Sequence, residues 1–154
     1  TVKVLLDAGA SLDYRTFGGG SALTNAVSNE DSDPDVVRIV LEKFKSSCSA
    51  KEFTSIVNYR MKASTLKWKV LYFVSKNLNR TGIAKSGLIY AMSLWSGTTA
   101  LNFAVIRGDV EIVKILLENG ADPYVENDLG MNAFEICKKS GPFKNVERVL
   151  RKRV

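Results

Sequence analysis

Residues 97–129 read GTTALNFAVIRGDVEIVKILLENGADPYVENDL and carry the signals of two short helices joined by a turn. Thr98 or Thr99 can cap the first helix, and Gly108-Asp109 interrupts the apolar pattern that follows. Gly120 is placed to end the second helix with a positive φ. The apolar positions at helical spacing are Leu101, Ala104, Val105, Val110, Ile112, Val113, Leu116 and Leu117.

Two short helices cannot bury these apolar faces alone, so the pair must repeat along the chain. Gly130 follows Gly97 at a spacing of about 33 residues, which is a repeat period, and residues 2–26 align with residues 113–137 without a gap. This spacing divides the chain into five units, at 1–18 (partial), 19–45, 46–96 (divergent and enlarged), 97–129 (complete) and 130–154 (a C-terminal capping unit).

The repeated pattern closely resembles the ankyrin-repeat family. The residues that carry the resemblance are Gly97 to Ala104, Gly108 to Leu117 and Gly120-Ala121-Asp122. The resemblance implies an all-α solenoid of stacked antiparallel helix pairs with short hairpin loops. We expect residues 1–154 to form one such domain, as part of a longer protein.

The divergent unit follows from the spacing of two glycines. The separation of Gly19 and Gly97 exceeds two repeat periods, and we interpret it as two periods of which the second is enlarged. Ser49 and Glu52 are spaced as a capping box at a helix start. Residues 66–70 fit a helix and also alternate like a strand, and residues 78–96 are typical of an extended loop or hairpin.

Composition argues against catalysis. The chain has no histidine and only two cysteines, Cys48 and Cys137, so no zinc site can be assembled from these residue types. We therefore expect a protein that is not an enzyme, with no cofactor, no metal and no small-molecule substrate. Cys137 stands at a small-residue position and is expected to be a buried, reduced thiol, which favours an intracellular, reducing compartment such as the cytoplasm.

The charge distribution is uneven. The chain carries a net charge of +6. The window between Glu52 and Asp109 holds eight basic residues and no acidic residue. Six of them form the predicted basic patch: Lys62, Lys67, Lys69, Lys76, Arg80 and Lys85. Such a patch suits an acidic protein, nucleic acid or an anionic membrane, and a simple solvated face is an equally open interpretation.

The family resemblance also implies a contact surface. Ankyrin repeats bind partners through their hairpin tips and the exposed positions of their first helices, on the concave side. Carried to this sequence, these positions predict partner contacts at Phe17, Trp95, Thr98, Ile106, Arg107, Asp128, Leu129 and Met131. Large apolar groups such as Phe17, Trp95, Ile106 and Met131 are expected to face solvent there, as interface anchors do.

The sequence therefore predicts a non-catalytic scaffold, or a subunit of a larger assembly, that binds a protein partner through its concave face. An acidic partner surface would match the basic patch. The alternative is a module that contacts nucleic acid or an anionic membrane through residues 53–108.

Overall fold

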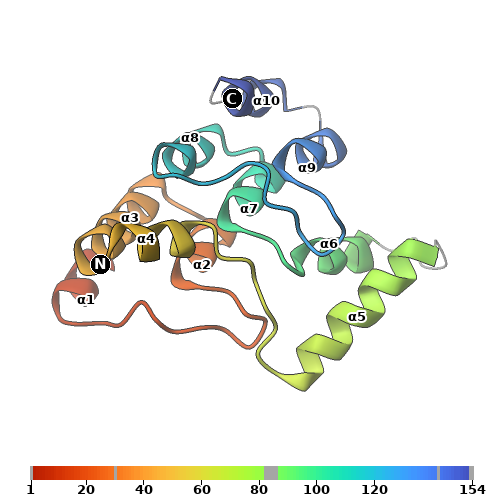
Figure 1. Cartoon of the computed structure of the whole chain (residues 1–154), viewed down its shortest axis with the longest axis horizontal. Helices are drawn as coiled ribbons and strands as arrows, with labels where there is room; N and C mark the ends of the chain where they lie inside the picture. Colours follow the sequence, from red (N-terminus) through yellow and green to blue (C-terminus); the bar gives the residue numbers. More distant parts are fainter. Residues whose placement is uncertain (1, 30, 82–86, 142, 153–154) are drawn as a thin grey trace.

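The computed structural model describes residues 2–29, 31–81, 87–141 and 143–152 (Figure 1). These residues form ten α-helices and no strand, which confirms the predicted all-α class. The helices are α1 (Val2–Asp7), α2 (Ala22–Ser28), α3 (Pro34–Ser47), α4 (Ala50–Val57), α5 (Leu66–Thr81), α6 (Gly87–Trp95), α7 (Ala100–Arg107), α8 (Val110–Glu118), α9 (Ala133–Ser140) and α10 (Lys144–Arg151).

Three helix pairs stack in two layers. The inner layer consists of α2, α7 and α9, and the outer layer consists of α3, α8 and α10 (Figure 1). Each inner helix also packs against the outer helix of its own pair, and α1 lies against α3 at one end. The stack therefore covers the apolar faces that no single pair could bury.

The prediction that residues 46–96 form an enlarged repeat within the stack is wrong. Helix α2 contacts α7 directly and α3 contacts α8, so the pair before this segment stacks on the pair after it. The stretch from Gly19 to Gly97 is therefore a single repeat period with an insertion that is itself longer than a period. The physical reason is that the two regular pairs already cover each other, which leaves no apolar face for an intervening pair.

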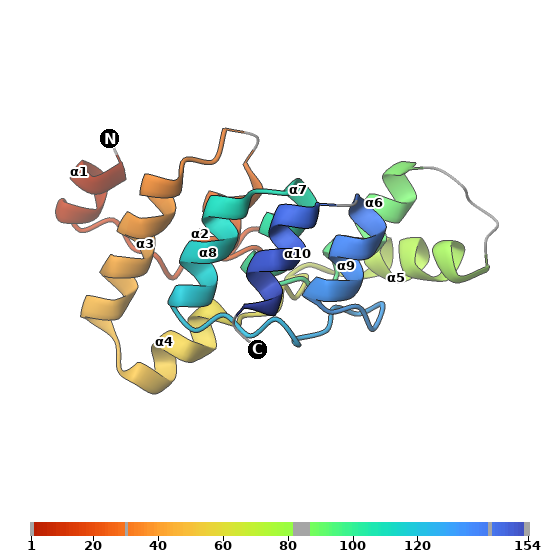
Figure 2. The ribbon, with the colours of Figure 1, turned by 90° about the horizontal axis from the view of Figure 1, so that it is seen from above.

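The inserted segment builds its own helices. Helix α4 packs on α3, while α5 and α6 pack on each other beside the stack (Figure 2). The alternation over residues 66–70 belongs to helix α5, not to a strand. The loop or hairpin predicted over 78–96 is also wrong, since α5 continues to Thr81 and α6 begins at Gly87. Residues 82–86, and with them Lys85 of the predicted basic patch, lie outside the described residues.

Hydrogen bonds tie the insertion to the hairpin tips. The Met61 amide donates to the Thr98 carbonyl over 2.9 Å, and the Gly97 amide donates to the Met61 carbonyl over 3.1 Å. The Ser64 amide donates to the Phe17 carbonyl over 3.3 Å. The loop between α4 and α5 therefore bridges the tip before α2 and the tip before α7, which holds α5 close to the inner layer.

The predicted helix ends are found where the sequence places them. Ser49 and Glu52 form the predicted reciprocal capping box of α4. Helix α3 also begins with a cap, since the Asp33 side chain accepts from the Asp35 amide and Pro34 follows in the first turn. The Thr99 side chain, not that of Thr98, caps α7 by accepting from the Asn102 amide. Gly120, just beyond α8, has a φ of +86° as predicted.

The core follows the predicted register. Leu101, Leu116 and Leu117 are all buried in one continuous apolar cluster between the layers. Cys137 is buried at the edge of the same cluster, as expected. Burial raises the pKa of the Cys137 thiol, and the nearby charge of Glu147 adds to the shift. The thiol therefore stays protonated and unreactive at neutral pH.

Candidate functional site

An open groove of about 500 Å³ lies between the inner layer and helix α5. Its walls come from the loops before α2 and α5, the inner helices α2 and α7, and the inserted helices α5 and α6. We call it the inner groove. Its largest lining side chains are Phe17, Met61, Trp68, Tyr72, Trp95, Phe103, Ile106 and Arg107.

Two aromatic pairs shape the inner groove. Trp68 and Tyr72 lie one helical turn apart on α5, with their ring centroids 5.7 Å apart. Trp95, at the end of α6, packs against Phe103 of α7 with a centroid distance of 6.5 Å. The Tyr72 hydroxyl donates to the Gly18 carbonyl over 3.2 Å, which joins the α5 wall to the loop before α2. The inner groove therefore has a rigid aromatic floor and a mainly apolar lining.

Burial raises the pKa of the Tyr72 phenol above its ordinary value. The phenol therefore stays neutral at physiological pH and keeps its proton for the hydrogen bond to Gly18. Arg107 ends α7, lines the inner groove and donates to the Asn29 carbonyl. Its guanidinium therefore places a positively charged rim beside an apolar surface.

A second cavity of about 370 Å³ adjoins the inner groove and shares Met61 and Tyr72 as lining residues. We call it the basic cleft. Its cations are Arg60, Lys62, Lys69 and Lys76. Arg60 is paired with Asp128 over 2.7 Å, and the Ser96 hydroxyl donates to the same carboxylate over 2.5 Å. The Arg60–Asp128 pair thus forms part of the lining of the basic cleft.

The family follows from the sequence as a whole. A model of ankyrin repeats in three copies matches residues 1–153. The chain belongs to the ankyrin-repeat family. This agrees with the helix pairs and confirms the resemblance, and proteins of this family mediate protein–protein interactions through extended concave surfaces.

Known proteins support the same fold. The chain is 25% identical over 143 residues to the mitochondrial disaggregase of Bos taurus, covering 93% of this chain and 20% of that protein. It therefore spans about a fifth of the length of this curated relative.

Two solved ankyrin-type structures are similar. One is the crystal structure of the yeast ribosomal protein Rps3 in complex with its chaperone Yar1, with a TM-score of 0.69, 22% identity, and coverage of 99% of this chain and 81% of that one. The other is the ankyrin repeat domain of Bcl-3, a member of the IkappaB protein family, with a TM-score of 0.58, 21% identity, and coverage of 97% and 44%. At these identities the likeness shows the fold.

The ankyrin fold brings half of the predicted contact residues together. Phe17, Trp95, Ile106 and Arg107 all line the inner groove, although they come from three separate parts of the sequence. Phe103, Trp68 and Tyr72 also line the inner groove and were not among the predicted contact residues, although Trp68 and Tyr72 fall on one face of a predicted helix. Their one-turn spacing on a predicted helix was the available signal.

The other predicted contact residues lie elsewhere. The expectation that Met131 faces solvent is wrong, because its side chain is buried in the core cluster. Thr98 is also buried, with its hydroxyl donating to the Leu94 carbonyl, so it holds the tip and presents nothing to a partner. Leu129 packs partly against the core, and Asp128 lies in the basic cleft, outside the inner groove.

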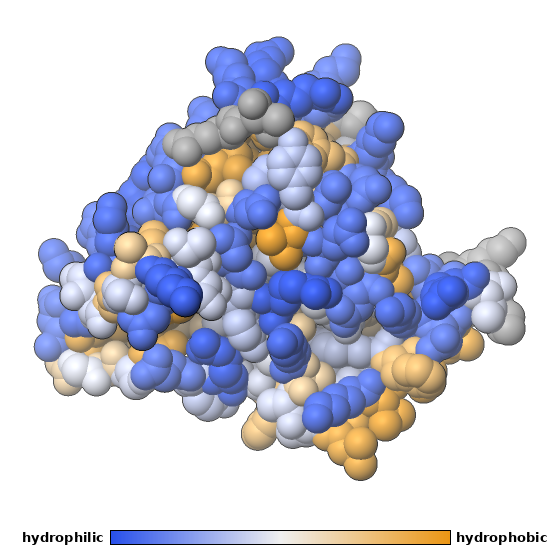
Figure 3. Space-filling model, viewed as in Figure 1, coloured by the Kyte–Doolittle hydropathy of each residue, from blue (hydrophilic) through white to orange (hydrophobic). Residues whose placement is uncertain are grey.

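The predicted basic patch is divided between two surfaces. Lys62, Lys69 and Lys76 line the basic cleft, whereas Lys67 and Arg80 are exposed on α5 outside it. Beside these lysines, α5 carries an exposed apolar stripe, with Leu66 at 77%, Val70 at 52% and Phe73 at 68% of full exposure, and Phe73 also lines the basic cleft. Figure 3 shows hydrophobic side chains gathered over this helix, a surface we call the α5 ridge.

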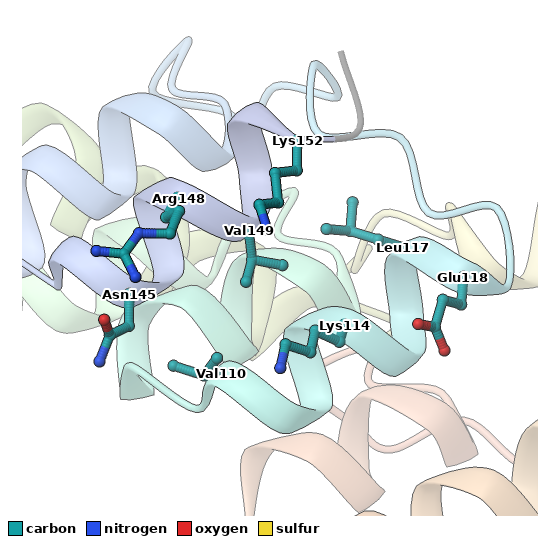
Figure 4. Close-up of a pocket in the computed structure, with 8 residues that line it drawn as sticks. All are labelled: Val110, Lys114, Leu117, Glu118, Asn145, Arg148, Val149 and Lys152. Atoms are coloured by element: carbon teal, nitrogen blue, oxygen red, sulfur yellow. The ribbon is translucent and has the colours of Figure 1, made fainter.

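A further cavity of about 580 Å³ lies in the outer layer, between α8 and α10 (Figure 4). Val110, Leu117 and Val149 line it, with Lys114, Arg148 and Lys152 among the charged groups around them. It is the seam between two regular second helices.

The described residues contain no cluster of three or more histidine, cysteine or acidic side chains able to hold a metal ion. They also contain no helix of sufficient length and hydrophobicity to span a bilayer.

Proposed function

We propose that this ankyrin-repeat chain is a non-catalytic scaffold that binds a protein partner in the inner groove. The observation that carries the proposal is the convergence of Phe17, Trp95, Ile106 and Arg107 on one open, aromatic-lined groove. A protein partner can cover such a surface with apolar side chains and satisfy the charged rim at Arg107 with its own polar groups.

The lining of the inner groove suits binding and lacks the side-chain types that most often act in catalysis. Among the described residues, the side chains that line it include no carboxylate, cysteine or histidine that could act as a general acid, base or nucleophile. We therefore also propose that the protein is not an enzyme and has no cofactor. The proposal also places the protein in a reducing intracellular compartment such as the cytoplasm, since Cys48 and Cys137 are both free thiols.

Phe17 offers the sharpest test because its side chain lines the inner groove and is still 68% exposed. We expect Phe17→Ala to weaken partner binding at least about fivefold, since truncating an aromatic hot-spot residue costs more than about 1 kcal/mol. Folding stability should change by less than about 0.5 kcal/mol, as is usual at exposed positions. The measurement is titration of a partner that a photoreactive side chain at Asn25, in the same groove, captures from native lysate.

Tyr14 provides the matched control, because it is an equally exposed aromatic of the same loop that does not line the inner groove. Tyr14→Ala should bind the partner as the unaltered chain does. Equal affinity for the Phe17 variant and the unaltered chain, with both folded, would reject the inner groove as the partner site.

A second candidate function rests on the α5 ridge. Leu66, Val70, Phe73 and Val74 form an exposed apolar stripe, and Lys67, Lys69 and Arg80 flank it on α5. An amphipathic helix with an apolar face and lysines beside it suits the interface of an anionic membrane. The α5 ridge is therefore our candidate for a membrane contact separate from the inner groove.

The membrane candidate predicts a loss of vesicle binding. Replacing Leu66 and Val70 with glutamine should reduce co-sedimentation with phosphatidylserine-containing vesicles at least about tenfold, because burial of each apolar side chain is worth about 1.5–3 kcal/mol. The control replaces Val4 and Leu5 of α1, which are also exposed neighbours on a helix, with glutamine. Sedimentation that is equal for both double variants, or absent for the unaltered chain, would remove this candidate.

A further inference from the structure

We propose that the basic cleft is an anion subsite of the inner groove, which selects partner segments carrying carboxylates next to a large apolar anchor. The inference rests on the proposed function, because it assumes that the apolar anchor occupies the inner groove. It adds the chemistry of the partner: an acidic segment whose aspartate or glutamate side chains enter the basic cleft.

The two cavities lie on either side of one wall. Met61 and Tyr72 line both of them, so a bound segment that crosses this wall from the inner groove reaches the basic cleft. The wall is firmly held, since the Met61 backbone pairs with residues 97 and 98 and the Tyr72 hydroxyl donates to the Gly18 carbonyl. A partner can therefore occupy both cavities without moving the wall between them.

The basic cleft carries more positive charge than its own acidic residue neutralises. Arg60 is paired with Asp128, but within the described residues no salt bridge engages Lys62, Lys69 or Lys76. Lys69 and Lys76 are two helical turns apart on α5 and project from the same side of that helix toward the cleft. Three ammonium groups at one cavity raise the local concentration of anions and favour carboxylates that enter it.

The geometry favours a carboxylate-bearing peptide over a phosphate backbone. The aromatic rings of the inner groove pack against one another in two tilted pairs, so they do not present a row of open faces for stacked bases. The Asp128 carboxylate also stands in the basic cleft, where it would repel a continuous line of phosphates. A peptide can place a few carboxylates beside the lysines and keep clear of Asp128.

The test is selection from a displayed library of randomised peptides on the immobilised chain, with sequencing of the bound pool. We expect enrichment of peptides that combine an aromatic or large aliphatic residue with nearby aspartate or glutamate. Replacing Lys69 and Lys76 with glutamine should abolish the acidic enrichment and leave the apolar enrichment. The matched control replaces Lys45 and Lys51, two exposed lysines outside both cavities, and should retain both enrichments.

The outcomes separate this inference from the proposed function. Apolar enrichment without acidic enrichment in the unaltered chain overturns the anion subsite and leaves the inner groove in place. Acidic enrichment that survives in the Lys69 and Lys76 double variant also overturns it, because the carboxylates are then recognised elsewhere. No enrichment of any kind, or a pool unchanged by Phe17→Ala, counts against the proposed function itself. Displacement of the selected peptides by single-stranded RNA, lost in the Lys69 and Lys76 variant, would assign the basic cleft to nucleic acid instead.

Discussion

Gly19→Ala is expected to destabilise the chain by about 2–5 kcal/mol. Gly19 has a φ of +91°, a left-handed conformation that costs an alanine about 1–2 kcal/mol. A Cβ at Gly19 would also overlap the carbonyl of Lys62 and lie 2.8 Å from the Lys62 amide nitrogen. Overpacking of this kind typically adds about 1–3 kcal/mol. The loss should be measured as the change in the free energy of unfolding in urea.

Gly120 supplies the control for backbone strain alone. Its φ is +86°, but nothing lies within 4 Å of a Cβ built there. Gly120→Ala should therefore cost only the strain, about 1–2 kcal/mol. If the two variants lose the same stability, the loop at Lys62 does not pack against the Gly19 tip, and the position of the whole insertion beside the stack is contradicted.

Leu116→Ala is the second large effect, with an expected loss of about 2–5 kcal/mol. Leu116 lies in the last turn of α8 and is fully buried between the layers. Removing its isobutyl group forfeits apolar burial and leaves a cavity that packed neighbours can fill only in part. The change should appear as a lower urea midpoint with an unchanged slope.

Leu5 provides a control at the equivalent position of the repeat. It aligns with Leu116 in sequence, yet its side chain is 57% exposed on α1, which packs against α3 at one end of the outer layer. Leu5→Ala should change the free energy of unfolding by less than about 0.5 kcal/mol. A loss below about 1 kcal/mol for Leu116→Ala would mean that the assigned register of α8 is wrong.

The same pair of leucines shows how far the sequence could predict the core. Helical periodicity identifies the apolar face of α8 and of α1 equally well. Whether a neighbouring helix covers that face depends on the order of the helices in the stack, which local pattern does not contain. Leu116 is buried as predicted, whereas Leu5 has the same local pattern and is exposed in this structure.

The candidate site divides in the same way. Phe17, Trp95, Ile106 and Arg107 could be predicted because each occupies a defined place in the repeat, at a tip or at the end of a first helix. Met131 occupies an equivalent tip, but its side chain turns into the core, so its burial could not be anticipated from position alone. Trp68 and Tyr72 join the inner groove only because the insertion folds back over the inner layer.

The local sequence is sufficient for the helix pairs, their caps and their register, because capping residues, glycines and apolar spacing act over a few neighbouring residues. The local sequence could not predict the path of residues 46–96, because the spacing between Gly19 and Gly97 suits either two irregular repeats or one repeat and an insertion. Tertiary packing decided between them: α2 contacts α7, α3 contacts α8, and the apolar side chains of these four helices share one buried cluster. Because the regular pairs pack on each other, α5 lies at the side of the stack, where its side chains line both the inner groove and the basic cleft.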